Sequence, residues 1–109
     1  MQNKVRLFTL ILITCIFAGC AKEEQTPAAP SNGEVVFKGT CRVCHAQGIN
    51  GAPIYGNKKM WSKRLPQGIP TLIEHATNGY GLMPAKGGNA DLTSQDISDA
   101  VNYMVSAVQ

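Results

Sequence analysis

The sequence predicts an all-α domain of about four helices and two glycine-rich loops, and three observations lead to this fold class. No stretch alternates polar and apolar residues for long enough to predict a strand. Glycine and proline punctuate residues 47–57 and 79–91, which marks both stretches as loops. The last segment carries an apolar stripe at helical spacing: Ile97, Ala100, Val101, Met104 and Val108.

The first helix is expected to run from Gly33 to about Cys44. Ser31 and Glu34 form the Ser-x-x-Glu pattern of a capping box at its start. Gly39 weakens the helix slightly, because glycine has a low helix propensity. The apolar residues that recur near helical spacing are Val36, Phe37 and Cys41.

Two further helices are expected between the loops, and one follows them. Asn57 can cap a short helix over residues 58–64, and Pro70 suits the first turn of a helix that continues to about Asn78. The last helix starts after Thr93, a capping residue, and Asp96 in its first turn complements the helix dipole.

Residues 1–19 are predicted to be a secretory signal peptide. Lys4 and Arg6 form a short positive region, and the uncharged apolar run that follows, Leu7–Gly19, is shorter than the ~20 residues of a membrane span. The end of this run, Phe17-Ala18-Gly19-Cys20, resembles a bacterial lipobox, although Phe17 stands where the pattern prefers leucine. We therefore expect a lipid on Cys20. Ordinary signal cleavage nearby and an uncleaved anchor are the alternatives.

Residues 20–32 are expected to form a flexible tether, and residues 33–109 the folded domain. The tether has two prolines and no bulky apolar residue beyond its lipidated cysteine, so it cannot form a core. Its r.m.s. span of roughly 20 Å would keep the domain close to a membrane. Ala21 resembles the corresponding residue of lipoproteins sent to the outer membrane.

The central motif of the domain is Cys41-Arg42-Val43-Cys44-His45, the Cys-x-x-Cys-His attachment pattern of c-type haem. On a helix, Cys41, Cys44 and His45 share one face, so two thiols can add to the haem vinyl groups while the imidazole reaches the iron. A thioredoxin-like redox pair, half of a zinc site and a structural disulfide are the alternatives. With Cys15 in the signal peptide and Cys20 lipidated, the haem assignment leaves no cysteine over.

The charge pattern limits the partners. The chain has 10 Lys and Arg against 7 Asp and Glu, a net charge of +3 that falls to +1 without Lys4 and Arg6. No basic tract predicts nucleic-acid binding. Five basic residues give the domain a basic side that is either solvated or a docking rim for an acidic redox partner: Lys58, Lys59, Lys63, Arg64 and Lys86.

Taken in order, the motifs of residues 33–109 resemble the class I c-type cytochromes, particularly the short bacterial monohaem proteins of the cytochrome c-five group. The pieces are Gly33 and Phe37 ahead of the pentapeptide, then Gly48-x-x-Gly51-Ala52-Pro53, Trp61-x-x-Arg64, Asn78-Gly79-x-Gly81-x-Met83-Pro84 and Ala100-Val101-Asn102-Tyr103-Met104. The resemblance implies a small cytochrome c fold around one covalent haem c.

The resemblance also implies roles for individual residues. Met83 would be the second axial ligand opposite His45, and a neutral thioether raises the reduction potential. The carbonyl of Pro53 would accept a hydrogen bond from His45 and fix its tautomer. Trp61 and Arg64 would approach a haem propionate, the alternative being a core indole and a solvated cation. His75, the other histidine of the chain, is expected to be solvated or to cap a helix.

The function predicted on these grounds is one-electron transport between membrane-associated redox proteins, not enzymatic catalysis. The protein is expected to be a monomer, to be exported, and to be held as a lipoprotein on the periplasmic side of a bacterial membrane. No small-molecule substrate is expected, because two axial ligands leave the iron no open position. The alternatives are a haem sensor or peroxidatic enzyme in which Met83 dissociates, and a haem-free thiol or zinc protein.

Overall fold

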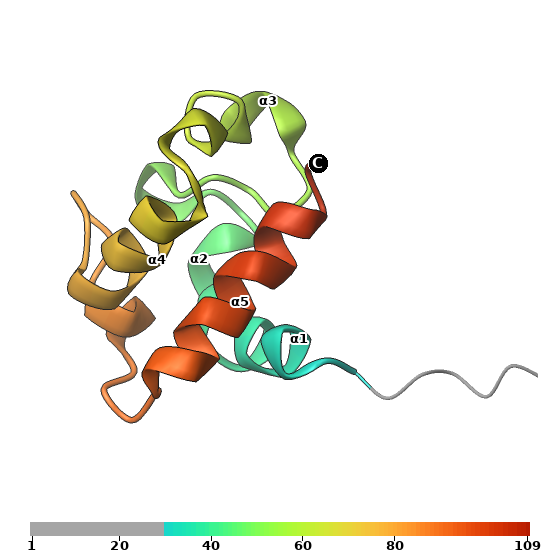
Figure 1. Ribbon diagram of the computed structural model, residues 1–109. Helices are drawn as coiled ribbons and strands as arrows, with labels where there is room; N and C mark the ends of the chain where they lie inside the picture. The colour runs from blue at the N-terminus through green and yellow to red at the C-terminus, as the bar shows by residue number, and fades with distance from the viewer. Residues whose placement is uncertain (1–29) are drawn as a thin grey trace, which may run out of the picture.

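The computed structural model describes residues 30–109, and helices dominate this part of the chain (Figure 1). Three segments follow one another without a break: α1 (Asn32–Val36), the π-helical turn η1 (Phe37–Cys41) and α2 (Arg42–His45). The others are η2 (Ile49–Gly51), α3 (Lys58–Trp61), η3 (Leu65–Gln67), α4 (Ile69–Asn78), η4 (Ala85–Gly88) and α5 (Ser94–Ser106). The all-α prediction of about four helices is confirmed.

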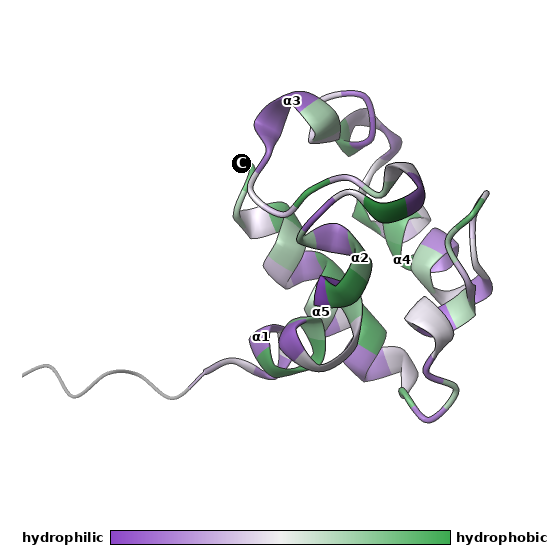
Figure 2. Ribbon diagram, turned by 180° about the vertical axis from the view of Figure 1, so that it is seen from behind, coloured by the Kyte–Doolittle hydropathy of each residue, from purple (hydrophilic) through white to green (hydrophobic). Residues whose placement is uncertain are grey.

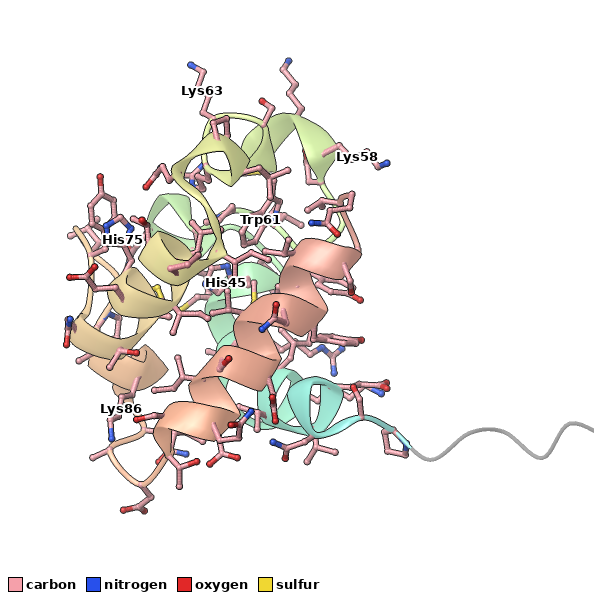
Figure 3. The ribbon with its side chains drawn as sticks, in the orientation of Figure 1. His45, Lys58, Trp61, Lys63, His75 and Lys86 are labelled. Carbon is pink, nitrogen blue, oxygen red and sulfur yellow. The ribbon has the colours of Figure 1, made fainter. Side chains whose placement is uncertain are left out.

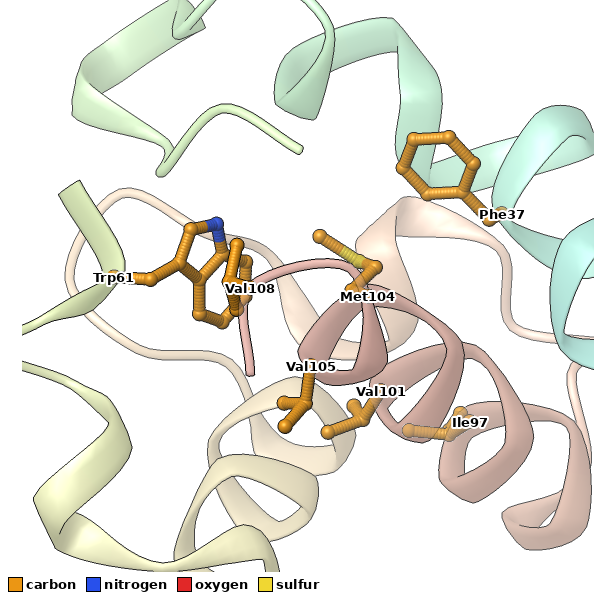
Figure 4. Packing of buried hydrophobic residues seen from close by; sticks show 7 residues of the cluster. All are labelled: Phe37, Trp61, Ile97, Val101, Met104, Val105 and Val108. Carbon is orange, nitrogen blue, oxygen red and sulfur yellow. The ribbon is translucent and has the colours of Figure 1, made fainter. Parts of the chain in front are cut away.

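Helix α5 organises the core. It packs against α1 on one side and α4 on the other. In Figure 2, hydrophobic and hydrophilic residues alternate along the helices of the domain. All five residues of the predicted stripe are buried, together with Val105, which is only 2% exposed. The core cluster on and around α5 is drawn in Figure 4: Phe37, Trp61, Ile97, Val101, Met104, Val105 and Val108.

Side-chain caps fix the starts of three helices, as the sequence predicted. The Ser31 hydroxyl accepts from the Glu34 N–H, but the Glu34 carboxylate pairs with Lys38, so only half of the predicted capping box forms. The Asn57 amide oxygen accepts from the Met60 N–H. At α5, Thr93 and Asp96 form a reciprocal capping box. Hydrogen bonds from Thr93 hold the pKa of the Asp96 carboxyl below its usual value.

The crossing of α1 and α5 depends on Gly33. A Cβ placed on this buried residue would collide with the carbonyl oxygen of Asp99 and lie 2.9 Å from the Cβ of Tyr103. The Asn32 amide reinforces the crossing by donating to Asp99 at 2.7 Å and to Asp96 at 3.2 Å. The backbones of the two helices therefore approach more closely than any side chain at residue 33 would allow.

Two helices differ from their predicted form. The first has the expected extent, but a π-helical turn interrupts it, with the Arg42 N–H donating to the carbonyl of Phe37, five residues earlier. The second ends at Trp61 instead of Arg64. After Trp61 the backbone leaves the α-helical pattern. The Arg64 N–H donates to the carbonyl of Trp61, only three residues earlier, and Pro66 has no N–H with which to continue an α-helix.

Three aromatic rings pack together, two of them stacked and the third, Phe37, tilted against both. The ring centroids of Tyr55 and Tyr103 lie 5.2 Å apart, and Phe37 lies 4.7 Å from Tyr55. Hydrogen bonding with the Tyr103 side chain, with burial adding to it, raises the pKa of Tyr55 to about 12.

Replacement of Tyr55 with phenylalanine is expected to weaken the alkaline loss of stability. An unfolded tyrosine ionises near pH ~10, whereas Tyr55 in the folded state keeps its proton to about pH 12, so stability is lost as the pH rises through this window. Urea unfolding between these pH values measures the slope, with Tyr80→Phe, at a 63% exposed residue, as the control. If the free energy of unfolding fell equally steeply with pH in the parent and in Tyr55→Phe, Tyr55 would not be the group responsible.

In residues 30–109 no helix combines the length and apolarity that crossing a membrane requires. The predicted signal peptide, the lipidation site Cys20 and most of the predicted tether lie outside the described residues. Those predictions remain predictions.

Candidate functional site

A cavity of about 590 Å³ opens between the two glycine-rich loops. Its walls come from α2, from the loops that carry η2 and η4, from α3 and α4, and from α5. The volume lies within the ~300–1,000 Å³ range of sites for small molecules and cofactors. The cysteines and histidine of the pentapeptide and Met83 all line this one cavity, so the fold brings together residues up to about forty positions apart in the chain.

Cys41 and Cys44 lie on the cavity wall with free thiols. Helical backbone continues through both, since η1 ends at Cys41 and α2 begins at Arg42. Burial raises the pKa of the Cys41 thiol. The pair is therefore two half-buried thiols facing the same space, without a disulfide between them.

His45 is buried, and its ring nitrogen Nδ1 lies 2.8 Å from the carbonyl oxygen of Pro53. A carbonyl only accepts, so Nδ1 carries the proton and Nε2 keeps a free electron pair. Burial lowers the pKa of the imidazole and the nearby Arg64 charge adds to this, while the bond to Pro53 opposes both. The neutral imidazole is the form that binds a metal.

Met83 reaches the cavity from the second loop, where backbone pairing holds it. The Tyr80 N–H donates to the Met83 carbonyl at 3.0 Å, and the Met83 N–H donates back at 2.9 Å. Gly79 starts this turn at φ +87°, and a Cβ there would lie 3.0 Å from the Met83 carbonyl oxygen. The loop can fold this tightly because glycine tolerates both the angle and the contact.

Met104 of α5 is a second thioether on the cavity wall. It is 5% exposed and belongs to the core cluster, as its helical position predicted. The cavity contact was not predicted, because a stripe at helical spacing does not distinguish a side chain packed on protein from one facing a cavity. Met83 and Met104 therefore need to be distinguished by experiment.

Trp61 and Arg64 both line the cavity, and each donates a hydrogen bond to a backbone carbonyl; this uses the one donor of the indole but only one of the five N–H groups of the guanidinium. The Trp61 indole N–H donates to Ile54 at 2.9 Å, and Arg64 Nη1 donates to Met60 at 2.6 Å. A propionate contact through the indole would require the bond to Ile54 to break. The Trp61 ring instead lies next to the imidazole of His45, with centroids 6.5 Å apart and an interplanar angle of 28° (Figure 3).

His75 is a lining residue that the sequence did not reveal. It was expected to be solvated or to cap a helix, but its ring stacks on Tyr80 with centroids 4.0 Å apart and an interplanar angle of 17°. Tyr80 is the residue paired with Met83, so α4 contacts the Met83 turn through this stack. No local pattern links the two residues, because the contact requires α4 and the loop to fold back on each other.

The residues present fit a covalent haem. Two free thiols can form the attachment bonds, a neutral imidazole and a thioether can bind iron, and the wall is mostly apolar. A bare metal ion fits poorly, because residues 30–109 contain no group of three His, Cys, Asp or Glu side chains arranged to hold one.

Comparison with known proteins gives a consistent set of relatives. The family described as "Cytochrome C oxidase, cbb3-type, subunit III" matches residues 28–104. Cytochrome c-555 of Prosthecochloris aestuarii is 48% identical over 86 residues, which cover 72% of this chain and 87% of the relative. Cytochrome c5 of Ectopseudomonas mendocina is 32% identical over 78 residues, 70% and 88% of the two chains.

A solved structure extends the similarity to three dimensions. One chain of the "Crystal structure of electron transfer complex of nitrite reductase with cytochrome c" superposes with a TM-score of 0.69 at 36% identity. The match covers 73% of this chain and 98% of that chain. The similarity therefore spans nearly the full length of each of these relatives.

Proposed function

Because the chain belongs to the class I monohaem c-type cytochromes and carries one covalently attached haem c, we propose that it is a one-electron carrier between membrane-associated redox proteins. The haem supplies the Fe(III)/Fe(II) couple. The protein residues attach the haem, set its potential and control access to it.

The proposal assigns each residue of the cavity a task. Cys41 and Cys44 would form the thioether bonds, and His45 would bind iron through Nε2 while Pro53 holds its other nitrogen. Met83 would supply a thioether as the second protein ligand. The observation that carries the proposal is that His45 and Met83, from opposite halves of the domain, line the same cavity, because two protein ligands on the iron would leave no position for a substrate.

Exposed apolar side chains around the cavity suit outer-sphere electron transfer. Ile49, Tyr80 and Leu82 line the cavity yet are 41%, 63% and 73% exposed. Such a rim can contact a partner without covalent chemistry. A relative of known structure forms an electron-transfer complex with nitrite reductase, which supports a redox protein as the partner.

The proposed location is the periplasmic side of a bacterial membrane. The basis is the sequence of residues 1–32, which predicts a signal peptide, lipidation of Cys20 and a tether. A tether raises the effective concentration of the carrier near its membrane partners.

Spectra and mass of the mature protein test the proposal together. A sulfur-to-iron charge-transfer band in the oxidised form, and no carbon monoxide binding in the reduced form, are expected. Ready carbon monoxide binding would favour a sensor or peroxidatic enzyme, and a missing Soret band would exclude haem altogether. Mass spectrometry should find the haem on the peptide with Cys41 and Cys44, and the lipid on Cys20.

Replacement of His75 with alanine is expected to loosen the Met83 turn. The lost stack with Tyr80 is worth about 1 kcal/mol, so the sulfur-to-iron band should disappear on heating several degrees earlier than in the parent. His75→Phe keeps an aromatic ring on Tyr80 and should restore most of the difference. Identical melting of the band in the parent and His75→Ala would show that the stack does not position Met83.

A further inference from the structure

Three Asn–Gly dipeptides occur in the chain, and they begin at Asn32, Asn50 and Asn78. Such a pair rearranges without an enzyme when the backbone nitrogen of the glycine attacks the side-chain amide of the asparagine before it. Glycine favours the attack because it has no side chain to obstruct its own nitrogen. The three dipeptides share this chemistry, so differences in their reactivity come from the structure around them.

Hydrogen bonds restrain two of the three dipeptides. The Asn32 side-chain amide donates to two carboxylates of α5, at 2.7 and 3.2 Å. At Asn50, the nitrogen that would attack belongs to Gly51, and its N–H donates to the Gly48 carbonyl at 3.1 Å. In both dipeptides a reacting group has to leave a hydrogen bond before the ring can close.

The third dipeptide lacks this restraint. Asn78 is the exposed last residue of α4. Within residues 30–109, the N–H of Gly79 forms no hydrogen bond of ordinary length and angle. Gly79 has φ +87° and ψ 155°, a combination that is open essentially to glycine alone. The fold therefore requires the residue that makes this site reactive.

We propose that Asn78–Gly79 is a modification site, at which the asparagine converts to isoaspartate and thereby displaces Met83. The Gly79 nitrogen loses its proton and bonds to the side-chain carbonyl carbon of Asn78, which releases its amide group as ammonia. Water then opens the resulting succinimide ring. Breakage of the new bond gives aspartate, and breakage of the original peptide bond gives isoaspartate. The net change is the uptake of water and the release of ammonia.

Isoaspartate would disturb the Met83 turn because it lengthens the chain that leads into it. The main chain of isoaspartate runs through the former side chain, which adds one carbon atom to the backbone between α4 and the turn (Figure 1). Little space is available, since even a Cβ on Gly79 would lie 3.0 Å from the Met83 carbonyl oxygen. The new carboxylate also lies at the C-terminal end of α4, where the helix dipole disfavours negative charge. The displacement rests on the proposed role of Met83 as an iron ligand.

Ageing of the haem-loaded full-length protein at mildly alkaline pH tests the site, because the attacking nitrogen must lose its proton. Peptide mapping by mass spectrometry follows isoaspartate at each dipeptide. Asn78 should convert about fivefold faster than Asn50, which is the factor that one backbone hydrogen bond contributes. In protein unfolded with guanidinium, the rates should become similar. Conversion at Asn32 or Asn50 as fast as at Asn78 in the folded protein would overturn the proposed site.

Glutamine variants test the displacement of Met83. Asn78→Gln has a side chain one methylene longer, from which the ring closes much more slowly, and Asn50→Gln is the matched control. During ageing, the sulfur-to-iron band should weaken in the parent and in Asn50→Gln, in step with isoaspartate formation, and should persist in Asn78→Gln. An equally persistent band in the parent, despite conversion of Asn78, would overturn the displacement. If the fresh parent lacks the band, the ligand role of Met83 fails instead, and peptide mapping still decides the modification site.

Discussion

Alanine in place of Gly33 is expected to lower the free energy of unfolding of the haem-loaded protein by roughly 2–3 kcal/mol. The added Cβ would meet the Asp99 carbonyl, and neither helix can move away without loosening the α1–α5 crossing. The bonds from Asn32 to Asp96 and Asp99 would weaken as the helices separate. Such a loss is a large fraction of the total stability of a small domain.

Gly39→Ala is the matched control for this experiment. It introduces the same methyl group in the same helical stretch, but no atom lies within 4 Å of the new Cβ. Guanidinium unfolding followed by circular dichroism compares the two variants with the parent. Equal stability of Gly33→Ala and Gly39→Ala would show that the close approach at Gly33 does not limit the packing of the helices.

Replacement of Met83 with alanine is expected to remove one of the two proposed iron ligands and to change the redox properties strongly. The sulfur-to-iron band should disappear, reduced protein should bind carbon monoxide, and the midpoint potential should fall by on the order of 0.1 V, within the ~0.8 V range that axial ligands span. Helix content should change little, because Met83 lies in a loop.

Met104→Leu is the control that the cavity itself provides, because Met104 is the other thioether on its wall. Leucine conserves the volume of this buried side chain, so folding should survive. The band and the potential should remain those of the parent. If Met104→Leu lost the band and Met83→Ala kept it, the ligand would be Met104, and the proposed role of the second loop would be wrong.

Much of the fold followed from local patterns. The stripe on α5 predicted its buried face, and the caps at Asn57 and Thr93 have the predicted partners, because capping depends only on residues three or four apart. Val105, the most buried side chain of residues 30–109, was not predicted to be in the core. It lies in the core cluster because α5 contacts α4 as well as α1, and one amphipathic stripe does not reveal a second neighbour.

The sequence predicted the haem-binding residues of the candidate site but not the contacts around them. The pentapeptide and Met83 stand in recognisable local sequences, and the two expected attachment cysteines and the two expected iron ligands line one cavity. The partner of the Trp61 indole, the stack of His75 on Tyr80 and the cavity contact of Met104 were not predicted. Each joins segments that are distant in the chain or depends on how a loop turns, which spacing alone does not encode.

The π-helical turn at Phe37–Cys41 determines the direction in which the haem motif faces around the helix axis. Each residue of an α-helix turns the chain by about 100°, and a π turn accommodates one additional residue within the same helix. Without it, the face that carries Cys41, Cys44 and His45 would be rotated by about that angle relative to the face of Gly33 that meets α5. The turn thus lets one continuous helical stretch present its first part to a neighbouring helix and its last part to the cofactor.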